Sequence, residues 1–181
     1  MNYRRKENLD NKSKELASLL LREKAVKFGD FILTSGGHSD YYVDIKDACT
    51  EPMILRLIVE ILKDKIVEKK VAGVELGAVP ILVGVSYALN LPYVIKRKEI
   101  KHGTGRLNIG VINNGEHIDV IEDVVTTGNS SLECVKYLRE NGALVSRVYC
   151  VVDREEGGKE LLHASGVELI PILKISDLRS R

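Results

Sequence analysis

The chain lacks the cysteine patterns that mark zinc sites and disulfide frameworks. Its 181 residues include three cysteines that are widely spaced, without a C-x-x-C pair or a Cys/His cluster. Cys134 and Cys150 lie among apolar residues, which is typical of small core side chains. We therefore expect no zinc site and a reducing compartment, the cytoplasm.

The chain also lacks an excess of either charge and a long apolar run. It carries 27 basic and 26 acidic side chains, so a net charge of +1 favours neither nucleic acid nor a membrane as partner. No apolar run could cross a bilayer, and the charged N-terminus, M-N-Y-R-R-K-E-N, is not typical of a signal peptide. With 44% hydrophobic and 29% charged residues, the composition predicts a single soluble domain over residues 1–181.

The segment 120–131 combines a buried strand, two acids and a hydroxyl-rich loop. It reads V-I-E-D-V-V-T-T-G-N-S-S, with apolar residues up to the acids Glu122 and Asp123. Small hydroxyl side chains then surround Gly128, and apolar residues at helical spacing follow. The pattern predicts a strand, a short polar loop and a helix.

This arrangement suits a phosphorylated sugar. The first amides of a helix lack partners, and the helix dipole makes that end positive, so a loop of small residues there can enclose a phosphate. The two acids would repel a phosphate alone, but they can accept hydrogen bonds from the hydroxyls of a ribose 5-phosphate. The alternative is that Glu122 and Asp123 are solvated acids at a strand end and that the loop is an ordinary helix cap. The combination of all three features favours the sugar phosphate.

The same segment resembles the motif with which type I phosphoribosyltransferases bind phosphoribosyl pyrophosphate (PRPP). That motif has apolar residues, two acids, two apolar residues and then Thr-x-Gly-x-[Ser/Thr]. The resemblance implies PRPP contacts for Glu122, Asp123, Val124, Val125, Thr126, Thr127, Gly128, Asn129 and Ser130. The motif indicates the superfamily and leaves the substrate open.

A second segment narrows the substrate. Residues 25–46 predict a hairpin, with strands at 26–33 and 41–45, and the hairpin alone would explain the glycines of its turn. The pattern F-x-L-x-S-G-x-x-S-x-Y-Y-x-D, from Phe31 to Asp44, resembles the N-terminal signature of orotate phosphoribosyltransferases. Thr34 stands where bacterial members commonly have a lysine, and the E-L-G-A-V-P turn around Val79 also lacks one. His38 occupies a variable turn position, so we expect it to be exposed and without function.

Residues 96–106, K-R-K-E-I-K-H-G-T-G-R, form a basic stretch with two glycines. A charge run is usually a solvated loop, but lysines on a closing lid could neutralise a departing pyrophosphate. The stretch resembles the catalytic loop of the family, with one residue fewer before the histidine. The resemblance implies that the 97–106 loop reaches the neighbouring subunit of a homodimer and that PRPP contacts come from Arg97, Lys98, Lys101 and His102. We expect Lys101 and Asp123 to be the catalytic residues.

Arg154 follows a predicted strand in the sequence D-R-E-E-G-G. A planar guanidinium can pair with a carboxylate through two hydrogen bonds, and orotate carries a carboxylate. The alternative is a surface arginine beside two glutamates. The D-R-x-E-x-G pattern resembles the family segment that contains the orotate-binding arginine, so we expect Thr126 and Arg154 to contact orotate.

Strands alternate with helices along most of the chain, which predicts an α/β fold with a mainly parallel sheet flanked by helices. The predicted elements include helices over 11–24, 53–70 and 80–89, and a hairpin of strands 107–111 and 116–121 around N-N-G. The resemblance implies the type I phosphoribosyltransferase fold. Within it, we expect a small hood from about residues 1–50 and the C-terminal tail, on a core of about residues 51–166.

The resemblance implies an enzyme that transfers the phosphoribosyl group of PRPP to orotate, in pyrimidine biosynthesis. Mg²⁺ is the implied cofactor, bound to pyrophosphate and ribose oxygens mostly through water, so no residue is assigned as a metal ligand. Two alternatives stay open. The N-terminal signature and Arg154 argue against a purine phosphoribosyltransferase, because a purine carries no carboxylate to pair with the arginine. A PRPP-sensing regulator would bind PRPP without catalysis.

Overall fold

A six-stranded sheet forms the centre of the computed structural model, which describes residues 3–32, 38–98 and 107–179. Its strand order is β5-β4-β3-β6-β7-β8, and all neighbours are parallel except β4 and β5. The strands are β3 (Val71–Val74), β4 (Tyr93–Lys96), β5 (Asn108–Ile109), β6 (Asp119–Val125), β7 (Arg147–Asp153) and β8 (Glu168–Lys174). The structure therefore confirms the mainly parallel sheet that the sequence predicts.

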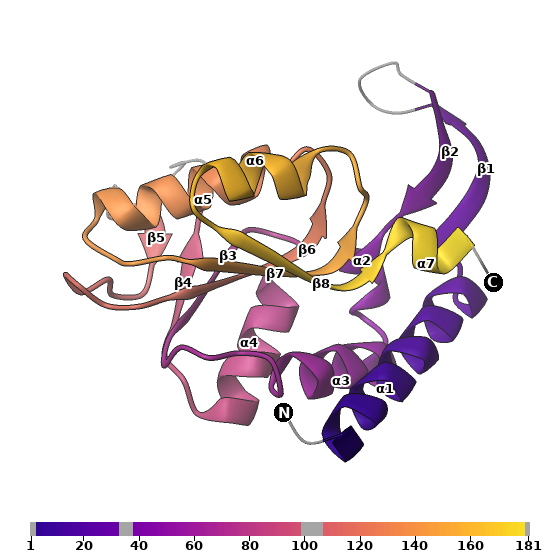
Figure 1. The fold of residues 1–181 in the computed structure, drawn as a ribbon, viewed down its shortest axis with the longest axis horizontal. Helices are drawn as coiled ribbons and strands as arrows, with labels where there is room; N and C mark the ends of the chain where they lie inside the picture. The colour runs from indigo at the N-terminus through magenta and orange to yellow at the C-terminus, as the bar shows by residue number, and fades with distance from the viewer. Residues whose placement is uncertain (1–2, 33–37, 99–106, 180–181) are drawn as a thin grey trace.

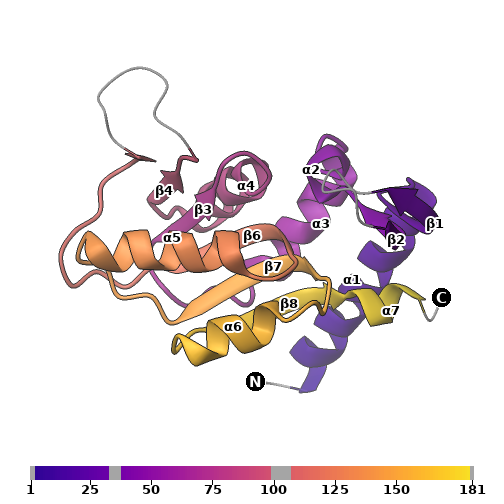
Figure 2. The same cartoon turned by 90° about the horizontal axis from the view of Figure 1, so that it is seen from above.

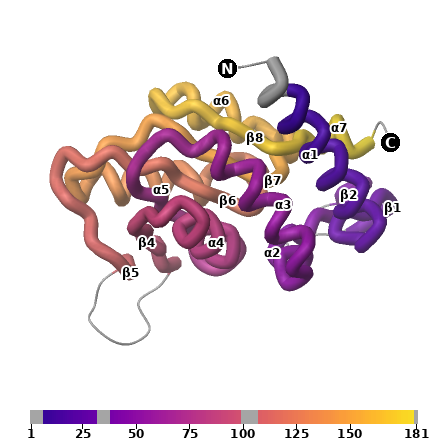
Figure 3. Tube along the Cα trace, turned by 90° about the horizontal axis from the view of Figure 1, so that it is seen from below, coloured from indigo at the N-terminus to yellow at the C-terminus, as the bar shows by residue number. Residues whose placement is uncertain are grey.

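Helices cover both faces of this sheet (Figure 1). On one face lie α5 (Asn129–Glu140) and α6 (Gly158–Ala164), and on the other lie α1 (Tyr3–Arg22), α3 (Pro52–Leu62) and α4 (Val79–Leu89), which Figure 3 shows from below. Successive residues of β6 alternate between the two layers, since Val120 packs in the α5 layer and Ile121 in the α3 layer. Every helix within the described ranges is too short or too polar to span a lipid bilayer.

A small antiparallel hairpin stands beside the main sheet (Figures 1 and 2). It consists of β1 (Val26–Ile32) and β2 (His38–Val43), and the short helix α2 (Ile45–Ala48) follows it. The last helix, α7 (Ile175–Arg179), lies next to the hairpin in both views. His38 is exposed, as predicted, and its Nδ1 lies 3.2 Å from Asp30 Oδ1. Thr34 and the rest of the hairpin turn lie outside the described residues.

The predicted helix over 53–70 is wrong in its second half, because α3 ends at Leu62. After Leu62 the chain forms hydrogen bonds with residues of the sheet instead of continuing the helix. The backbone amides of Val67 and Glu68 donate to Asp119 Oδ2 at 2.9 and 3.0 Å, and the Tyr149 hydroxyl donates to the Lys65 carbonyl at 3.0 Å. Apolar periodicity continued past Leu62, but these tertiary contacts set the end of the helix.

The predicted hairpin around N-N-G is also wrong. β5 pairs with β4, and β6 lies between β3 and β7 at the centre of the sheet. The loop between β5 and β6 is bound to the core instead, because Lys70 Nζ donates to Glu116 Oε2 at 2.6 Å and to the Val111 carbonyl at 3.0 Å. A good turn sequence therefore joins two strands that are not neighbours.

Asp119 at the start of β6 is a buried anchor of the fold. Its side chain has no exposed area and accepts the two amides described above, and Arg147 Nε lies 3.2 Å from its Oδ1. Arg147 also pairs with Glu68. The charged side chains of Asp119, Arg147 and Glu68 therefore connect β6, β7 and the segment after α3.

We expect Asp119→Ala to lower the free energy of unfolding by about 3–5 kcal/mol, because it removes one of the two acidic partners of Arg147 and leaves two amides without their acceptor. Urea unfolding measures this change. Asp10→Ala, on an exposed position of α1, is the control and should shift stability by less than about 0.5 kcal/mol. Equal effects of the two substitutions would contradict the anchor role of Asp119.

Candidate active site

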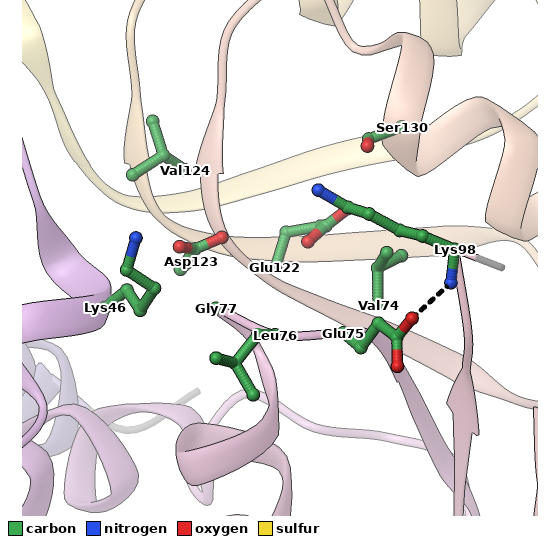
Figure 4. Close-up of a pocket in the computed structure, with 10 residues that line it drawn as sticks. All are labelled: Lys46, Val74, Glu75, Leu76, Gly77, Lys98, Glu122, Asp123, Val124 and Ser130. Carbon is green, nitrogen blue, oxygen red and sulfur yellow. Dashed lines mark hydrogen bonds between the residues drawn. The ribbon is translucent and has the colours of Figure 1, made fainter. Parts of the chain in front are cut away.

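The two acids of the 120–131 segment lie at the carboxyl end of β6. Glu122 is only 4% exposed, and Asp123 is half-buried beside it. Figure 4 shows the two carboxylates side by side in one pocket. The carboxyl ends of parallel strands are the usual place for ligands in α/β sheets, so the sheet topology itself brings the acids to this edge.

The pocket has a volume of about 320 Å³ and collects residues from four parts of the chain. These are α2, the turn between β3 and α4, the end of β4, and the end of β6 with the start of α5 (Figure 4). Its lining consists of Lys46, Val74, Glu75, Leu76, Gly77, Lys98, Glu122, Asp123, Val124 and Ser130. Residues 75–77 of the E-L-G-A-V-P turn therefore form one wall of the pocket.

Burial changes the acidity of both carboxyl groups. Burial raises the pKa of Glu122 to about 8, and the neighbouring charge of Asp123 adds to the rise. Burial also raises the pKa of Asp123, although backbone amides and the positive charge of Lys46 oppose it. Ser131 Oγ donates a hydrogen bond to Glu122 Oε1 at 3.3 Å. The pair is thus poorly solvated, and a ligand that offers hydroxyls or positive charge would stabilise its ionised form.

The turn between β3 and α4 approaches Asp123 very closely at Gly77. A Cβ atom on residue 77 would lie 2.0 Å from Asp123 Oδ2, so no other residue fits without displacing the carboxylate. Next to it, Glu75 Oε1 accepts a hydrogen bond from the Lys98 backbone at 2.7 Å. The turn after β3 therefore lies against β6 at Gly77 and is hydrogen-bonded to the segment after β4 at Glu75.

A second cavity, of about 300 Å³, lies over the hydroxyl-rich loop. Residues 124–131 line it, at the start of α5. Gly128 has a φ of 81° and its position for a Cβ lies 3.0 Å from Gly158 Cα, so both the backbone conformation and the close approach of α6 require glycine. No side chain caps α5, which leaves its first amides available to an anion.

Arg154 lies directly after β7, on the neighbouring strand. Its backbone amide donates to the Val125 carbonyl at 2.9 Å, which places it next to Thr126 and the second cavity. Its side chain is largely enclosed, and Nη2 lies 2.9 Å from Glu156 Oε1. The alternative of a freely solvated surface arginine does not fit this enclosure.

The structure brings most of the predicted site residues to one edge of the sheet. The acid pair, Lys98 and Ser130 share the first pocket, and Val124 to Ser130 line the second. Arg97 is described through its backbone, which donates to the Leu107 carbonyl at 2.8 Å, but it does not line either cavity. Lys101 and His102 lie outside the described residues, so their predicted roles stay predictions.

Lys46 lines the pocket but was not predicted as a site residue from the sequence. It belongs to α2, after the Tyr-Tyr-x-Asp segment, and its amine lies near Asp123 in Figure 4. An isolated lysine on a short helix carries no local pattern, since its position depends on how the hairpin packs beside the sheet. Only the fold reveals that the pocket contains this cation.

Comparison with known proteins gives consistent matches. Residues 50–170 match the family model of the phosphoribosyl transferase domain. The chain is 57% identical to the orotate phosphoribosyltransferase of Thermoplasma acidophilum over 160 residues, 88% of this chain and 94% of the relative. It is 47% identical to that of Methanocaldococcus jannaschii over 175 residues, 95% of this chain and 99% of the relative.

A solved structure has the same fold. It is the orotate phosphoribosyltransferase of Mycobacterium tuberculosis H37Rv in complex with 5-phospho-α-D-ribosyl 1-diphosphate. The two structures agree with a TM-score of 0.78 at 29% sequence identity, over 93% of this chain and 99% of the other.

The raised pKa of Glu122 predicts a specific pH dependence of stability. The folded-state pKa of about 8 lies above the ordinary value of 4.5, so the folded state keeps a proton that the unfolded chain releases. The contribution of Glu122 to the free energy of unfolding therefore falls as the pH rises between these values. We expect Glu122→Gln to remove this fall. The difference in the free energy of unfolding between the variant and wild type should therefore increase in favour of the variant by at least about 1.4 kcal/mol from pH 5 to pH 9, the equivalent of one pKa unit.

Urea unfolding at a series of pH values measures the effect. Glu133→Gln, at an exposed position of α5, is the matched control and should follow the wild-type profile. If Glu122→Gln also follows that profile, the acid pair is not desolvated in the way described.

Proposed function

The chain belongs to the phosphoribosyltransferase family, and we propose that it is an orotate phosphoribosyltransferase. Its fold is the type I fold of that family, as the sequence predicts. The reaction joins N1 of orotate to C1′ of PRPP and releases pyrophosphate, which forms orotidine 5′-monophosphate in pyrimidine biosynthesis. The observation that carries the proposal is the identity with known orotate phosphoribosyltransferases along nearly the whole chain.

PRPP would bind across the two cavities. The 5-phosphate fits the loop from Thr126 to Ser130, where the uncapped start of α5 offers amides and positive potential. The ribose hydroxyls would then donate to Glu122 and Asp123. Hydroxyl donors bound to these poorly solvated carboxyl groups would stabilise their ionised form. The negative charge of the ionised pair would then favour the positive charge that builds on the ribose ring during the transfer.

Basic residues on the Lys98 side of the pocket would neutralise the charge of the departing pyrophosphate. Lys98 lines the pocket just after β4, and we propose that the 97–106 segment, to which it belongs, acts as a lid. We assign Arg97, Lys98, Lys101 and His102 to the pyrophosphate. Lys101 is the residue we expect to affect the rate most, because a cation that meets the leaving group in the transition state stabilises charge as it develops.

Orotate would lie between Thr126 and Arg154. These residues follow the adjacent strands β6 and β7, and the Arg154 guanidinium offers paired donors for the orotate carboxylate. A purine base carries no carboxylate for this arginine to pair with, which favours orotate over the purine alternative.

Mg²⁺ is the proposed cofactor, and the donor set of the pocket fits it. No group of three His, Cys, Asp or Glu side chains suited to a metal occurs in the described part of the chain. The carboxylates of Glu75, Glu122 and Asp123 are nevertheless hard oxygen donors, which suit an ion that keeps several waters and binds through substrate oxygens. When bound, Mg²⁺ would neutralise charge on the pyrophosphate.

We extend the proposal to a cytoplasmic homodimer in which the lid reaches the partner's site. An exposed apolar surface on α4 and the start of β4 supports an interface. Tyr87 is 90% exposed, and a surface hollow lies between it, Val83 and Tyr93. Within each subunit, residues 1–50 and the C-terminal tail would form the hood over the base.

The purified protein, with PRPP and Mg²⁺, should consume orotate, which is measured as loss of orotate absorbance. We expect Arg154→Ala to lower kcat/KM for orotate about 10- to 100-fold, since it removes a charged hydrogen-bond donor pair. Lys101→Ala should lower kcat by about 100-fold or more. Lys136→Ala, at an exposed position of α5, is the control and should keep wild-type kinetics.

The outcomes separate the alternatives. Turnover of a purine base without turnover of orotate would leave the family assignment intact and refute the orotate assignment. Binding of PRPP without turnover of any base would favour a PRPP-sensing regulator. Wild-type turnover by Arg154→Ala would show that the base is recognised elsewhere.

A further inference from the structure

The guanidinium of Arg154 is bound along one edge by two other side chains. Its Nε donates to the Tyr41 hydroxyl at 3.0 Å, and its Nη2 pairs with Glu156 Oε1 at 2.9 Å. The Tyr41 hydroxyl in turn donates to the same Glu156 oxygen at 2.6 Å. The three side chains form a closed ring of hydrogen bonds, so Arg154 has little rotational freedom.

This ring uses a particular pair of donors. A guanidinium has five N–H groups in a plane, and Nε and Nη2 point toward the same edge. Tyr41 and Glu156 occupy that inner edge. The outer edge, between Nη1 and Nη2, still has two parallel N–H groups, which is the geometry that a carboxylate accepts with both oxygens. The Arg154 side chain is 16% exposed, so it is largely enclosed but not completely buried.

Tyr41 is itself held by contacts from the hairpin and the C-terminal helix. The guanidinium of Arg179 lies 5.2 Å from the centre of the Tyr41 ring, and Arg179 Nη2 pairs with Asp40 Oδ2 at 2.6 Å. The Tyr41 side chain is buried in this arrangement. The hairpin, α7 and the end of β7 therefore meet at one point, beside Arg154.

The turn after β7 places Glu156 next to Arg154. Glu155, between them, has a φ of 57°, and its amide donates to Asp153 Oδ1 at 2.9 Å. Its own carboxylate accepts the Ser176 amide at 3.1 Å at the start of α7. The turn is thus bonded at both sides, and the position of the Glu156 backbone does not depend on a ligand.

We propose that Tyr41 and Glu156 are positioning residues for Arg154, which they hold by its inner edge so that its outer edge binds the carboxylate of the base. The inference rests on the proposed function, because it takes orotate as the base. A carboxylate-free base gains nothing from this alignment, so the ring makes the site selective for an acidic base.

A competing explanation predicts the opposite sign. If Glu156 occupied the place of the substrate carboxylate, it would compete with orotate for Arg154, and its removal would improve orotate binding. The two explanations are distinguished by whether KM for orotate rises or falls when the Glu156 carboxylate is removed.

The test is steady-state kinetics with both substrates varied, on wild type, Glu156→Ala, Glu156→Gln and Tyr41→Phe. We expect Glu156→Ala and Tyr41→Phe to raise KM for orotate about tenfold, the worth of one charge-assisted hydrogen bond, with kcat and KM for PRPP within about twofold. Glu156→Gln keeps an acceptor oxygen and should recover most of the loss. Glu160→Ala, at an exposed position of α6, is the control.

An unchanged or lower KM for orotate in Glu156→Ala would overturn the inference. So would an equal rise of both KM values together with a lower melting temperature, since that result would mean a purely structural role. If wild type consumes no orotate at all, the proposed function fails first and the inference fails with it. If wild type consumes orotate and Arg154→Ala does not, but Glu156→Ala behaves as wild type, only the inference fails.

Discussion

The burial of two adjacent carboxyl groups at the end of β6 is the constraint on which the rest of the site depends. Desolvation raises the pKa of both groups, so their ionisation in the pocket carries an electrostatic cost. The surrounding structure reduces that cost only in part, through Ser131, the nearby lysines and the backbone amides at Asp123. A ligand that brings hydroxyl donors to the acids and a phosphate to the adjacent helix start would satisfy both needs. A phosphorylated ribose carries both groups, which is why the 120–131 segment indicates such a ligand.

The position of the acids follows from the sheet. Asp119 fixes the start of β6 and the end of the segment after α3, and parallel pairing with β3 and β7 brings three strand ends to one edge. The β3–α4 turn then passes so close to Asp123 that any side chain at residue 77 would displace the Asp123 carboxylate. Recognition of the base would use the neighbouring strand end and the hairpin beside it, where Tyr41 and Glu156 contact Arg154. The sugar phosphate and the base are therefore assigned to adjacent strands of one sheet.

The local parts of this site could be predicted from the sequence, and the parts that depend on packing could not. The 120–131 segment is contiguous, so its strand, acids and loop are visible in the residue order, and Arg154 follows a strand in a distinctive pattern. Lys46 reaches the pocket only because the hairpin packs beside the sheet, and Glu156 contacts Tyr41 across 115 positions of sequence. The same reason explains the errors in the predictions for α3 and β5. The end of α3 and the partner of β5 are set by tertiary contacts of Asp119 and Lys70, and local periodicity contains no information about those contacts.

The most direct test of this account is a crystal structure of the protein with PRPP and Mg²⁺ bound. The account predicts that Glu122 and Asp123 lie within hydrogen-bonding distance of the ribose hydroxyls, and that the 5-phosphate contacts the amides from Thr126 to Ser130. A ribose bound away from the two acids, or a 5-phosphate bound outside that loop, would contradict the claim that the buried acid pair organises the site.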